Sequence, residues 1–220
     1  LFEAQKMYAD ARKRKSNYGL GTSTYGLACI YQTMGRFREA EKTIEESIAA
    51  LSKADEISQL LSAYNVLDET LDGLRKYEKL RAKCTEWKAV IDKYKNEALR
   101  KGYTPSLNGR YLYCTLATAV AEFETGHYDR AKELLQLADK YAEGRKAVAQ
   151  FKLLQVKARY YVATKQYDRA IACNNENMNI MTAAGDSVSL LTVQMQQADL
   201  YTQAGRYKEA AELYRAIIPH

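Results

Sequence analysis

Apolar side chains recur along the chain at the three- and four-residue steps of an α-helix. One stretch carries Ala40, Ile44, Ile48 and Leu51 at these steps. Because a side chain returns to the same face of a helix every 3.6 residues, such positions form one buried stripe. Ala, Leu, Lys, Glu and Gln, which all favour helix, are abundant, and the chain contains only 2 prolines. The pattern predicts an all-α fold.

A short recurring pattern separates the expected helices into pairs. It consists of a small or polar residue, one spacer, an aromatic residue, two spacers and usually Ala, as in Gly35, Phe37 and Ala40. Gly suits the left-handed conformation that ends a helix, and a small Ala allows two helices to approach closely. Five copies, four of them clear and that at 75–80 weaker, predict about five helical hairpins. The copies occupy residues 35–40, 75–80, 126–131, 165–170 and 205–210.

The copies also predict how the chain is divided. Residues 1–16 are expected to be the trailing helix of a truncated preceding repeat, and residues 17–220 a solenoid of repeats. Gly19–Gly26 is interpreted as a turn leading into a helix, because a phosphate-binding loop would need a preceding strand. Ser106 and either Asp186 or Ser187 are expected helix N-caps. The predicted repeats cover residues 21–54, 56–101, 106–143, 145–184 and 187–218.

These residues resemble the tetratricopeptide repeat (TPR) family. The family pattern runs from a small residue through Tyr, Gly, an aromatic residue and Ala to a large apolar residue, at fixed spacings. The first copy matches it at Ala28, Tyr31, Gly35, Phe37, Ala40 and Ile44, and the fifth at Ala198, Tyr201, Gly205, Tyr207, Ala210 and Tyr214. The chain departs from it at Asp68, Glu122, Lys165 and Asn174 and has a longer period than the family's roughly 34 residues. The resemblance implies a right-handed α-α superhelix.

Charge and cysteine content narrow the functional classes. The net charge is +6 and the pI about 9.0, but Lys and Arg alternate with Asp and Glu, as expected of solvated helix faces. No basic stripe is interleaved with aromatic residues, so no nucleic-acid partner is expected. The 4 cysteines are widely separated and fall in apolar helical stretches, which favours buried thiols over a disulfide framework.

No pattern of catalytic or ligand-binding residues emerges. The 2 histidines, His127 and His220, have no Asp, Cys or Ser at a motif spacing. Cys29 and Cys114 have no neighbouring base in the sequence, so packing is favoured over nucleophilic chemistry. The chain is therefore expected to be no enzyme and to hold no cofactor or metal. The run Asn174–Asn179 is interpreted as either a hydrogen-bonded contact surface or a loosened helix.

The family resemblance places a partner on the concave face, which the first helix of each hairpin lines. A mixture of aromatic, amide, charged and apolar side chains there suits a peptide or an irregular protein surface. Packing between neighbouring repeats is the alternative role for each residue. The expected contact positions are Tyr25, Asn65, Glu69, Tyr113, Leu116, Gln155, Arg159, Met195 and Asp199, with Cys29 beside Tyr25.

Two functions are compatible with a protein- or peptide-binding repeat module. The long irregular repeats resemble the sensor regions of bacterial hybrid two-component histidine kinases. This resemblance implies a sensory or regulatory domain, a homodimer, a periplasmic location, and attachment to a membrane only through segments outside these residues. The alternative is a cytoplasmic TPR adaptor that binds a partner peptide. The sequence identifies neither the partner nor the ligand.

Overall fold

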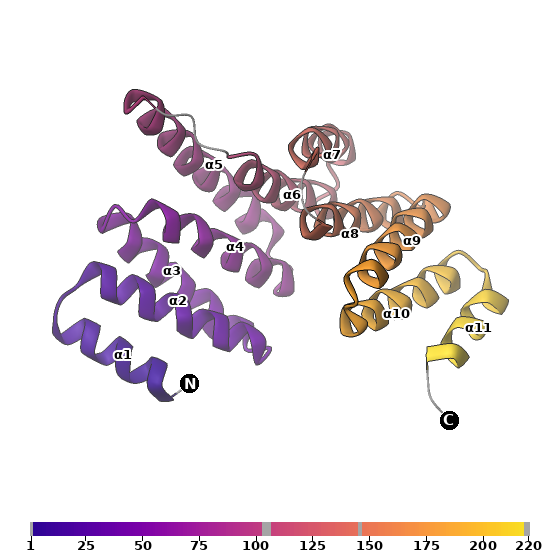
Figure 1. Cartoon of the computed structure of the whole chain (residues 1–220), viewed down its shortest axis with the longest axis horizontal. Coiled ribbons are helices and arrows are strands. Elements are labelled where there is room, and N and C mark those ends of the chain that lie inside the picture. The colour runs from indigo at the N-terminus through magenta and orange to yellow at the C-terminus, as the bar shows by residue number, and fades with distance from the viewer. Residues whose placement is uncertain (1, 103–106, 145–146, 218–220) are drawn as a thin grey trace. The chain divides into compact units, whose positions relative to one another are not determined.

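The computed structural model describes residues 2–102, 107–144 and 147–217, and over these residues the chain forms helices and no strands. The predicted all-α class with stacked helical hairpins is confirmed (Figure 1). The first described helix is α1 (Phe2–Lys13). Four antiparallel pairs within the units are α2 (Asn17–Thr33) with α3 (Phe37–Lys53), α4 (Ile57–Gly73) with α5 (Tyr77–Arg100), α8 (Ala147–Ala163) with α9 (Tyr167–Ala184), and α10 (Ser187–Gln203) with α11 (Tyr207–Ile217). Between the second and third of these pairs, the chain forms α6 (Asn108–Glu124) and α7 (Tyr128–Ala142).

The chain divides into two compact units, each with its own packing. Unit 1 comprises Leu1–Ala121 and unit 2 comprises Glu122–His220. The dividing point lies inside α6, whose residues up to Ala121 belong to unit 1.

The turns between paired helices share one backbone conformation. Gly35, which follows α2, has φ of 70°, and the amide of Arg36 donates a hydrogen bond to the carbonyl of Tyr31 at 2.8 Å. A glycine in the left-handed conformation, followed by an amide that bonds back to a carbonyl of the last helical turn, forms a Schellman-type helix end. Arg75 and Lys165 adopt the same conformation, with φ of 54° and 58°. The hairpin geometry therefore persists where the sequence lacks glycine.

The core of unit 1 is built from the inward stripes of α2 to α6. Trp87 is 1% exposed and stacks on Tyr64, with ring centroids 5.9 Å apart. Ala28 and Ala40 are both fully buried, as expected where paired helices approach most closely. Glu41 is also buried, and its carboxylate pairs with Lys76, the residue before α5, and with Lys79 of α5, at 2.6 and 2.8 Å.

The expected turn at Gly19–Gly26 is wrong, because these residues are helical. α2 begins at Asn17, and the Ser16 side chain caps it by accepting a bond from the Gly19 amide at 3.1 Å. Packing against α3 explains why glycine is accepted here. A Cβ on Gly21 would stand 2.6 Å from Cγ of Leu51, and the hydroxyl of Ser47 donates to the Gly21 carbonyl at 2.7 Å.

The packing in unit 2 combines an apolar cluster with a polar contact. Ala158, Ala170, Ile171 and Leu200 form the cluster. Beside it, a set of buried amides joins α9 to α10. We call Asn174 and Gln197, which are 2% and 1% exposed, the α9–α10 polar contact, whereas the amide atoms of Asn177, which is 0% exposed, have no hydrogen-bond partner among the described residues.

This polar contact corrects the interpretation of the asparagine run. The Asn174 amide donates to the carbonyl of Val193 and to Oε1 of Gln197, both at 2.9 Å. The run lies within a regular helix, so the interpretation as a loosened helix is wrong. Asn174 and Asn177 are buried, whereas Asn175, Glu176 and Asn179 are exposed, and a contact surface stays a prediction for these three. Asp186 caps α10 by accepting from the Ser189 amide at 3.0 Å, whereas Ser106 lies outside the described residues.

Candidate partner-binding site

Three first helices of unit 1 contribute side chains to one surface. On α2, Tyr25, Cys29 and Gln32 lie at the four- and three-residue steps that place them on one face. On α4, Glu69 lies beside them, since Nε2 of Gln32 donates to its Oε2 at 3.2 Å. From α6, the charge of Arg110 acts on the Tyr25 hydroxyl. We call these five residues the first-helix face of unit 1.

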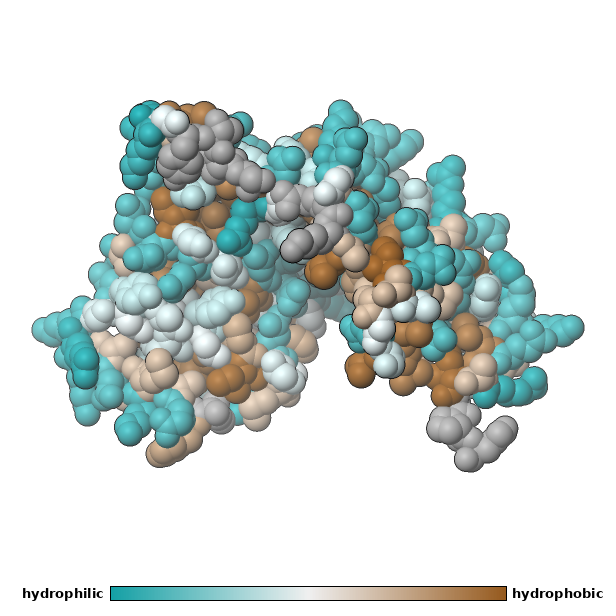
Figure 2. Space-filling model, viewed as in Figure 1, coloured by the Kyte–Doolittle hydropathy of each residue, from teal (hydrophilic) through white to brown (hydrophobic). Residues whose placement is uncertain are grey.

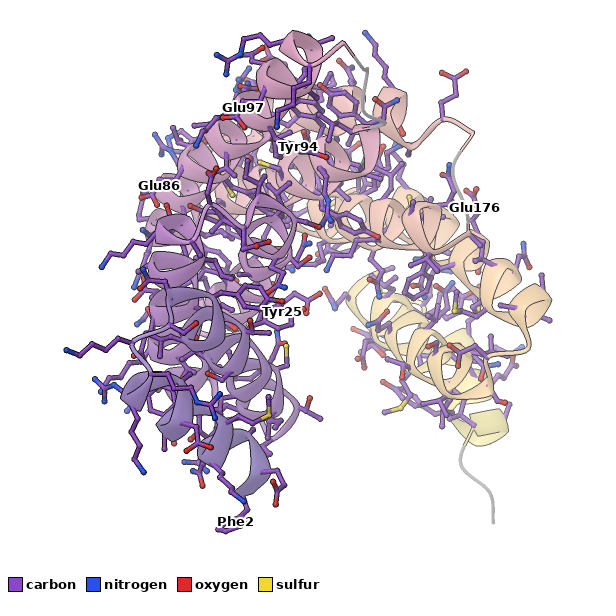
Figure 3. All side chains as sticks on the ribbon, turned by 60° about the vertical axis from the view of Figure 1, so that its left-hand side comes forward. Phe2, Tyr25, Glu86, Tyr94, Glu97 and Glu176 are labelled. Carbon is purple, nitrogen blue, oxygen red and sulfur yellow. The ribbon has the colours of Figure 1, made fainter. Side chains whose placement is uncertain are left out.

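The side chains of this face are accessible but not fully exposed. Glu69 is exposed, whereas Tyr25, Cys29 and Arg110 are half-buried. In the view of Figure 3, Tyr25 lies on one side of the unit 1 ribbon and Glu86, on the second helix α5, lies on the opposite side. Figure 2 shows that the surface over α2 is of intermediate hydropathy, in keeping with the Gly, Ser, Thr and Tyr residues of this helix. Such a surface suits contacts with a mixed polar and apolar partner.

The electrostatics of the face favour binding over nucleophilic chemistry. Burial raises the pKa of the Tyr25 hydroxyl, neighbouring Cys29 and Glu69 raise it further, and Arg110 opposes them. Burial also raises the pKa of the Cys29 thiol, although its hydrogen bond with Tyr25 lowers it in part. Because the thiolate is the reactive form, a raised pKa leaves Cys29 a weak nucleophile at neutral pH.

The remaining predicted residues of unit 1 differ in accessibility. Asn65 is half-buried and its Nδ2 donates to the Leu61 carbonyl at 3.4 Å. Tyr113 is half-buried and packs against the core. Leu116 is only 1% exposed. A partner cannot reach Leu116 in this structure, because its side chain points into the packed interior rather than outward from α6.

Unit 2 carries the other four predicted contact residues on α8 and α10. Gln155 and Arg159 are half-buried on α8, where Arg159 pairs with Oε1 of Glu124 at 2.8 Å and lies 5.8 Å from the centroid of the Phe123 ring. Met195 and Asp199 are exposed on α10. Arg159 is therefore held by contacts within its own unit.

The α10 surface also contains residues that the sequence analysis missed. Val188 is 79% exposed and Leu191 44%, and they lie on the same side of the helix as Met195, which is 51% exposed. Hydrophobic residues appear among the hydrophilic ones over the α8–α10 region in Figure 2. The Tyr214 hydroxyl donates to Oδ1 of Asp199, which ties the end of this stripe to α11. In unit 1, Gln32 and Arg110 were also missed, although Gln32 lies seven residues from Tyr25 and so shares its face.

Clusters suited to catalysis or metal binding are not found in the part of the chain that the structure describes. No group of three His, Cys, Asp or Glu side chains there could hold a metal ion. Nδ1 of His127 lies 2.9 Å from the Thr125 hydroxyl and 3.4 Å from Oε2 of Glu122, on an exposed turn. His220 lies outside the described residues. None of the described helices has the length and apolar character to cross a membrane.

Comparison with known proteins agrees with this geometry. Two tetratricopeptide-repeat family models match the chain, over residues 23–58 and 150–219. No curated protein sequence matches it significantly. The solved structures that resemble it share its fold at low sequence identity.

Three of these structures illustrate the range. BtubC (BKLC) from P. vanneervenii has a TM-score of 0.64 at 15% identity, covering 98% of this chain and 87% of that one. Nearly identical TPR-like repeats assigned to a kinesin light chain of Podosopora anserina give 0.54 at 22%, covering 89% and 92%. The apo form of RapI gives 0.59 at 11%, covering 97% and 93%. The chain therefore carries tetratricopeptide repeats over residues 23–58 and 150–219, and its fold resembles that of TPR-like proteins.

Proposed function

We propose that this chain is a non-catalytic adaptor that holds a peptide segment of a partner protein on the first-helix face of unit 1. TPR repeats are protein–protein interaction modules, and this chain has the repeats. The observation that carries the proposal is the hydrogen bond from Gln32 to Glu69, which joins α2 and α4 beside Tyr25, together with the charge of Arg110 from α6 that acts on the Tyr25 hydroxyl. An aromatic ring, a carboxylate and a guanidinium on one accessible surface can recognise a peptide of mixed character.

The absence of catalysis is part of the same proposal. Burial raises the pKa of Cys114 to about 12, and burial likewise raises the pKa of Cys29 and Cys173. Catalytic cysteines require the opposite shift. A robust turnover that is lost on substituting one of these residues would contradict this part of the proposal.

The test is to select peptides from a display library on the folded chain and to measure their affinity for matched variants by calorimetry. Tyr25→Ala and Glu69→Lys should each weaken binding about tenfold or more, since anchors at the centre of an interface carry most of its energy. Glu86→Lys, the same charge reversal on α5, should leave affinity unchanged. Equal affinities for the Glu69 and Glu86 variants would refute the assignment of the binding face.

The sensory alternative concerns the parent protein rather than this face. We propose to test it by reading the complete gene that encodes this chain and by measuring the oligomeric state of the protein. A membrane-spanning segment and a histidine-kinase domain in the same frame, together with a stable homodimer by light scattering, would support a sensor region and a periplasmic location. A reading frame without them would leave the cytoplasmic adaptor.

A further inference from the structure

A hollow lies in unit 2, apart from the predicted contact residues. It has a volume of about 290 Å³ and is lined by parts of α7, α8 and the beginning of α9. We call it the α7–α9 hollow. Its chemically important residues are Lys132 and Asp139 of α7, Lys157, Tyr160 and Tyr161 of α8, and Arg169 of α9.

This hollow is separate from the predicted partner-binding residues of α8. Successive residues of a helix are rotated by about 100°, so Lys157 points about 200° away from both Gln155 and Arg159. Tyr160 and Tyr161 flank Lys157 on the same side. The hollow therefore faces the side of α8 opposite to the predicted contact residues, and α7 and α9 provide its walls.

Positively charged side chains outnumber negatively charged ones in the lining of the hollow. Nζ of Lys157 is neutralised by Oδ1 of Asp139 at 2.6 Å. Lys132 is exposed and has no ion pair with a described residue. Arg169 uses Nη1 to donate to Oε1 of Gln166 at 2.9 Å, and a guanidinium has five donor N–H groups. Lys132 and Arg169 therefore leave two positive charges in excess among the lining residues.

The surroundings add a weak opposing charge. Burial raises the pKa of Tyr160, and Asp129 raises it further from outside the lining, whereas Arg169 lowers it. Asp129 is fully exposed on the first turn of α7, so solvent screens its effect. The hollow therefore keeps the excess positive charge of Lys132 and Arg169.

The floor of the hollow is aromatic and apolar. Leu135 is 5% exposed and Tyr160 7%, and the Tyr160 and Tyr161 rings meet edge to face with centroids 5.6 Å apart. The guanidinium of Arg169 lies 5.7 Å from the centroid of the Tyr161 ring, which holds it at the edge of this floor. A ligand that combines an aromatic ring with a dianion would match the hollow, because the ring can pack on the apolar floor and the dianion can lie between Lys132 and Arg169. A phosphate monoester carries about −1.5 to −2 charges at neutral pH, which matches the excess.

A neighbouring hollow extends the basic surface across the α8–α9 turn. Its volume is about 450 Å³ and its lining includes Lys165, Asp168 and Arg206, and it shares Gln166 and Arg169 with the first hollow. Arg206 is partly engaged, since it pairs with Glu209 and lies 3.7 Å from Oδ1 of Asp168. A ligand that reaches both hollows must be extended, which favours a peptide over a small molecule.

We infer that the α7–α9 hollow binds a phosphotyrosine side chain of a peptide partner whose neighbouring acidic residues lie along the second hollow. The phosphate is held by Lys132 and Arg169, and the ring rests on Leu135, Tyr160 and Tyr161. This site does not depend on the first-helix face of unit 1. The module can therefore bind two segments, one of them only after phosphorylation.

The test is fluorescence anisotropy with a labelled short peptide that carries phosphotyrosine between acidic residues, compared with the same peptide carrying tyrosine. The phosphorylated form should bind at least about tenfold more tightly, because its phosphate accepts charge-assisted hydrogen bonds that the tyrosine hydroxyl cannot. Lys132→Gln and Arg169→Gln should each remove most of this difference. Lys140→Gln, on the same helix but outside the lining, should not. Circular dichroism establishes that each variant is folded, and Arg169→Lys should retain part of the affinity.

Four outcomes would overturn the inference, the last of which concerns the first-helix face. The first is equal affinity for the two peptides, and the second is equal loss in the Lys132 and Lys140 variants. The third is competition by phenyl phosphate with an affinity as high as that of the peptide, since it would show a site for a free aryl phosphate. Inorganic phosphate should compete only weakly, because it lacks the ring. Loss of binding by Glu69→Lys would indicate the first-helix face instead, which separates this inference from the proposed function.

Discussion

Alanine substitutions at two glycines of α2 should change the stability of unit 1 in opposite directions. No heavy atom lies within 4 Å of the position of a Cβ on Gly26, whereas a Cβ on Gly21 would stand 2.6 Å from Cγ and 2.7 Å from Cδ2 of Leu51. Glycine inside a helix costs about 1 kcal/mol relative to alanine. Gly26→Ala should therefore stabilise unit 1 by about 0.5–1 kcal/mol.

Gly21→Ala gains the same helix propensity but overfills the contact between α2 and α3. Carbon atoms in contact prefer roughly 3.5–4.0 Å, so Leu51 would have to retreat by about 1 Å. Leu51 is fully buried, and its backbone nitrogen would also lie only 3.2 Å from the new Cβ. Overfilled cores lose about 1–3 kcal/mol. After subtracting the propensity gain, we expect a net loss of about 1–2 kcal/mol.

Trp87 makes this measurement specific to unit 1. It is the 1 tryptophan of the chain, and its side chain is buried in the unit 1 core. Urea titration followed by tryptophan fluorescence should give a higher midpoint for Gly26→Ala than for the unsubstituted protein and a lower one for Gly21→Ala. Adding Leu51→Ala should make Gly21→Ala less harmful, because the smaller side chain removes the clash. A Gly21→Ala variant as stable as Gly26→Ala would refute the close approach of the two helices.

Three further substitutions address other features. Lys165→Gly should stabilise unit 2 by about 0.5–1 kcal/mol, because a φ of 58° strains a residue that has a Cβ. Thermal unfolding followed by circular dichroism measures this, and an unchanged or lower melting temperature would contradict it. Asn177→Leu should stabilise the same unit by about 1–3 kcal/mol, since both amide atoms of this buried side chain lack a partner among the described residues; a loss of stability would show that a bound water satisfies them. Burial opposes ionisation of Glu41, but hydrogen bonds from Lys76 and Lys79 outweigh it and lower the pKa below the ordinary 4.5. Stability from Glu41 is therefore complete above pH 4.5 and lost as the pH falls through the lowered pKa, and Glu41→Gln should remove this part of the acid dependence measured by Trp87 fluorescence.

The hairpins could be predicted because each has a local cause. The segment containing Gly35, Phe37 and Ala40 ends one helix, makes a turn and begins the next within six residues. Such signals depend on neighbours in the sequence, and they hold in the structure. The start of α2 could not be predicted in this way. Three glycines between 19 and 26 indicate a turn by local preference, and only the packing of Gly21 against Leu51 shows why a glycine suits a helix at that position.

The candidate site was less predictable because accessibility depends on tertiary packing. Leu116 occupies a position that the family uses for contacts, but here the side chain is buried. Arg110 was missed because its relation to Tyr25 crosses from α6 to α2, far apart in the sequence. The asparagines of α9 were misinterpreted for the same reason, since the partners of Asn174 lie on α10.

The turns at Arg75 and Lys165 have a consequence for how such proteins diverge. These residues follow the same backbone path as Gly35, although neither is glycine. The packing of the paired helices, rather than the residue at the turn, therefore maintains the path. The residue at the turn can therefore be substituted while the hairpin keeps its structure. A search for these hairpins by glycine at the turn would therefore miss the two that turn at Arg75 and Lys165.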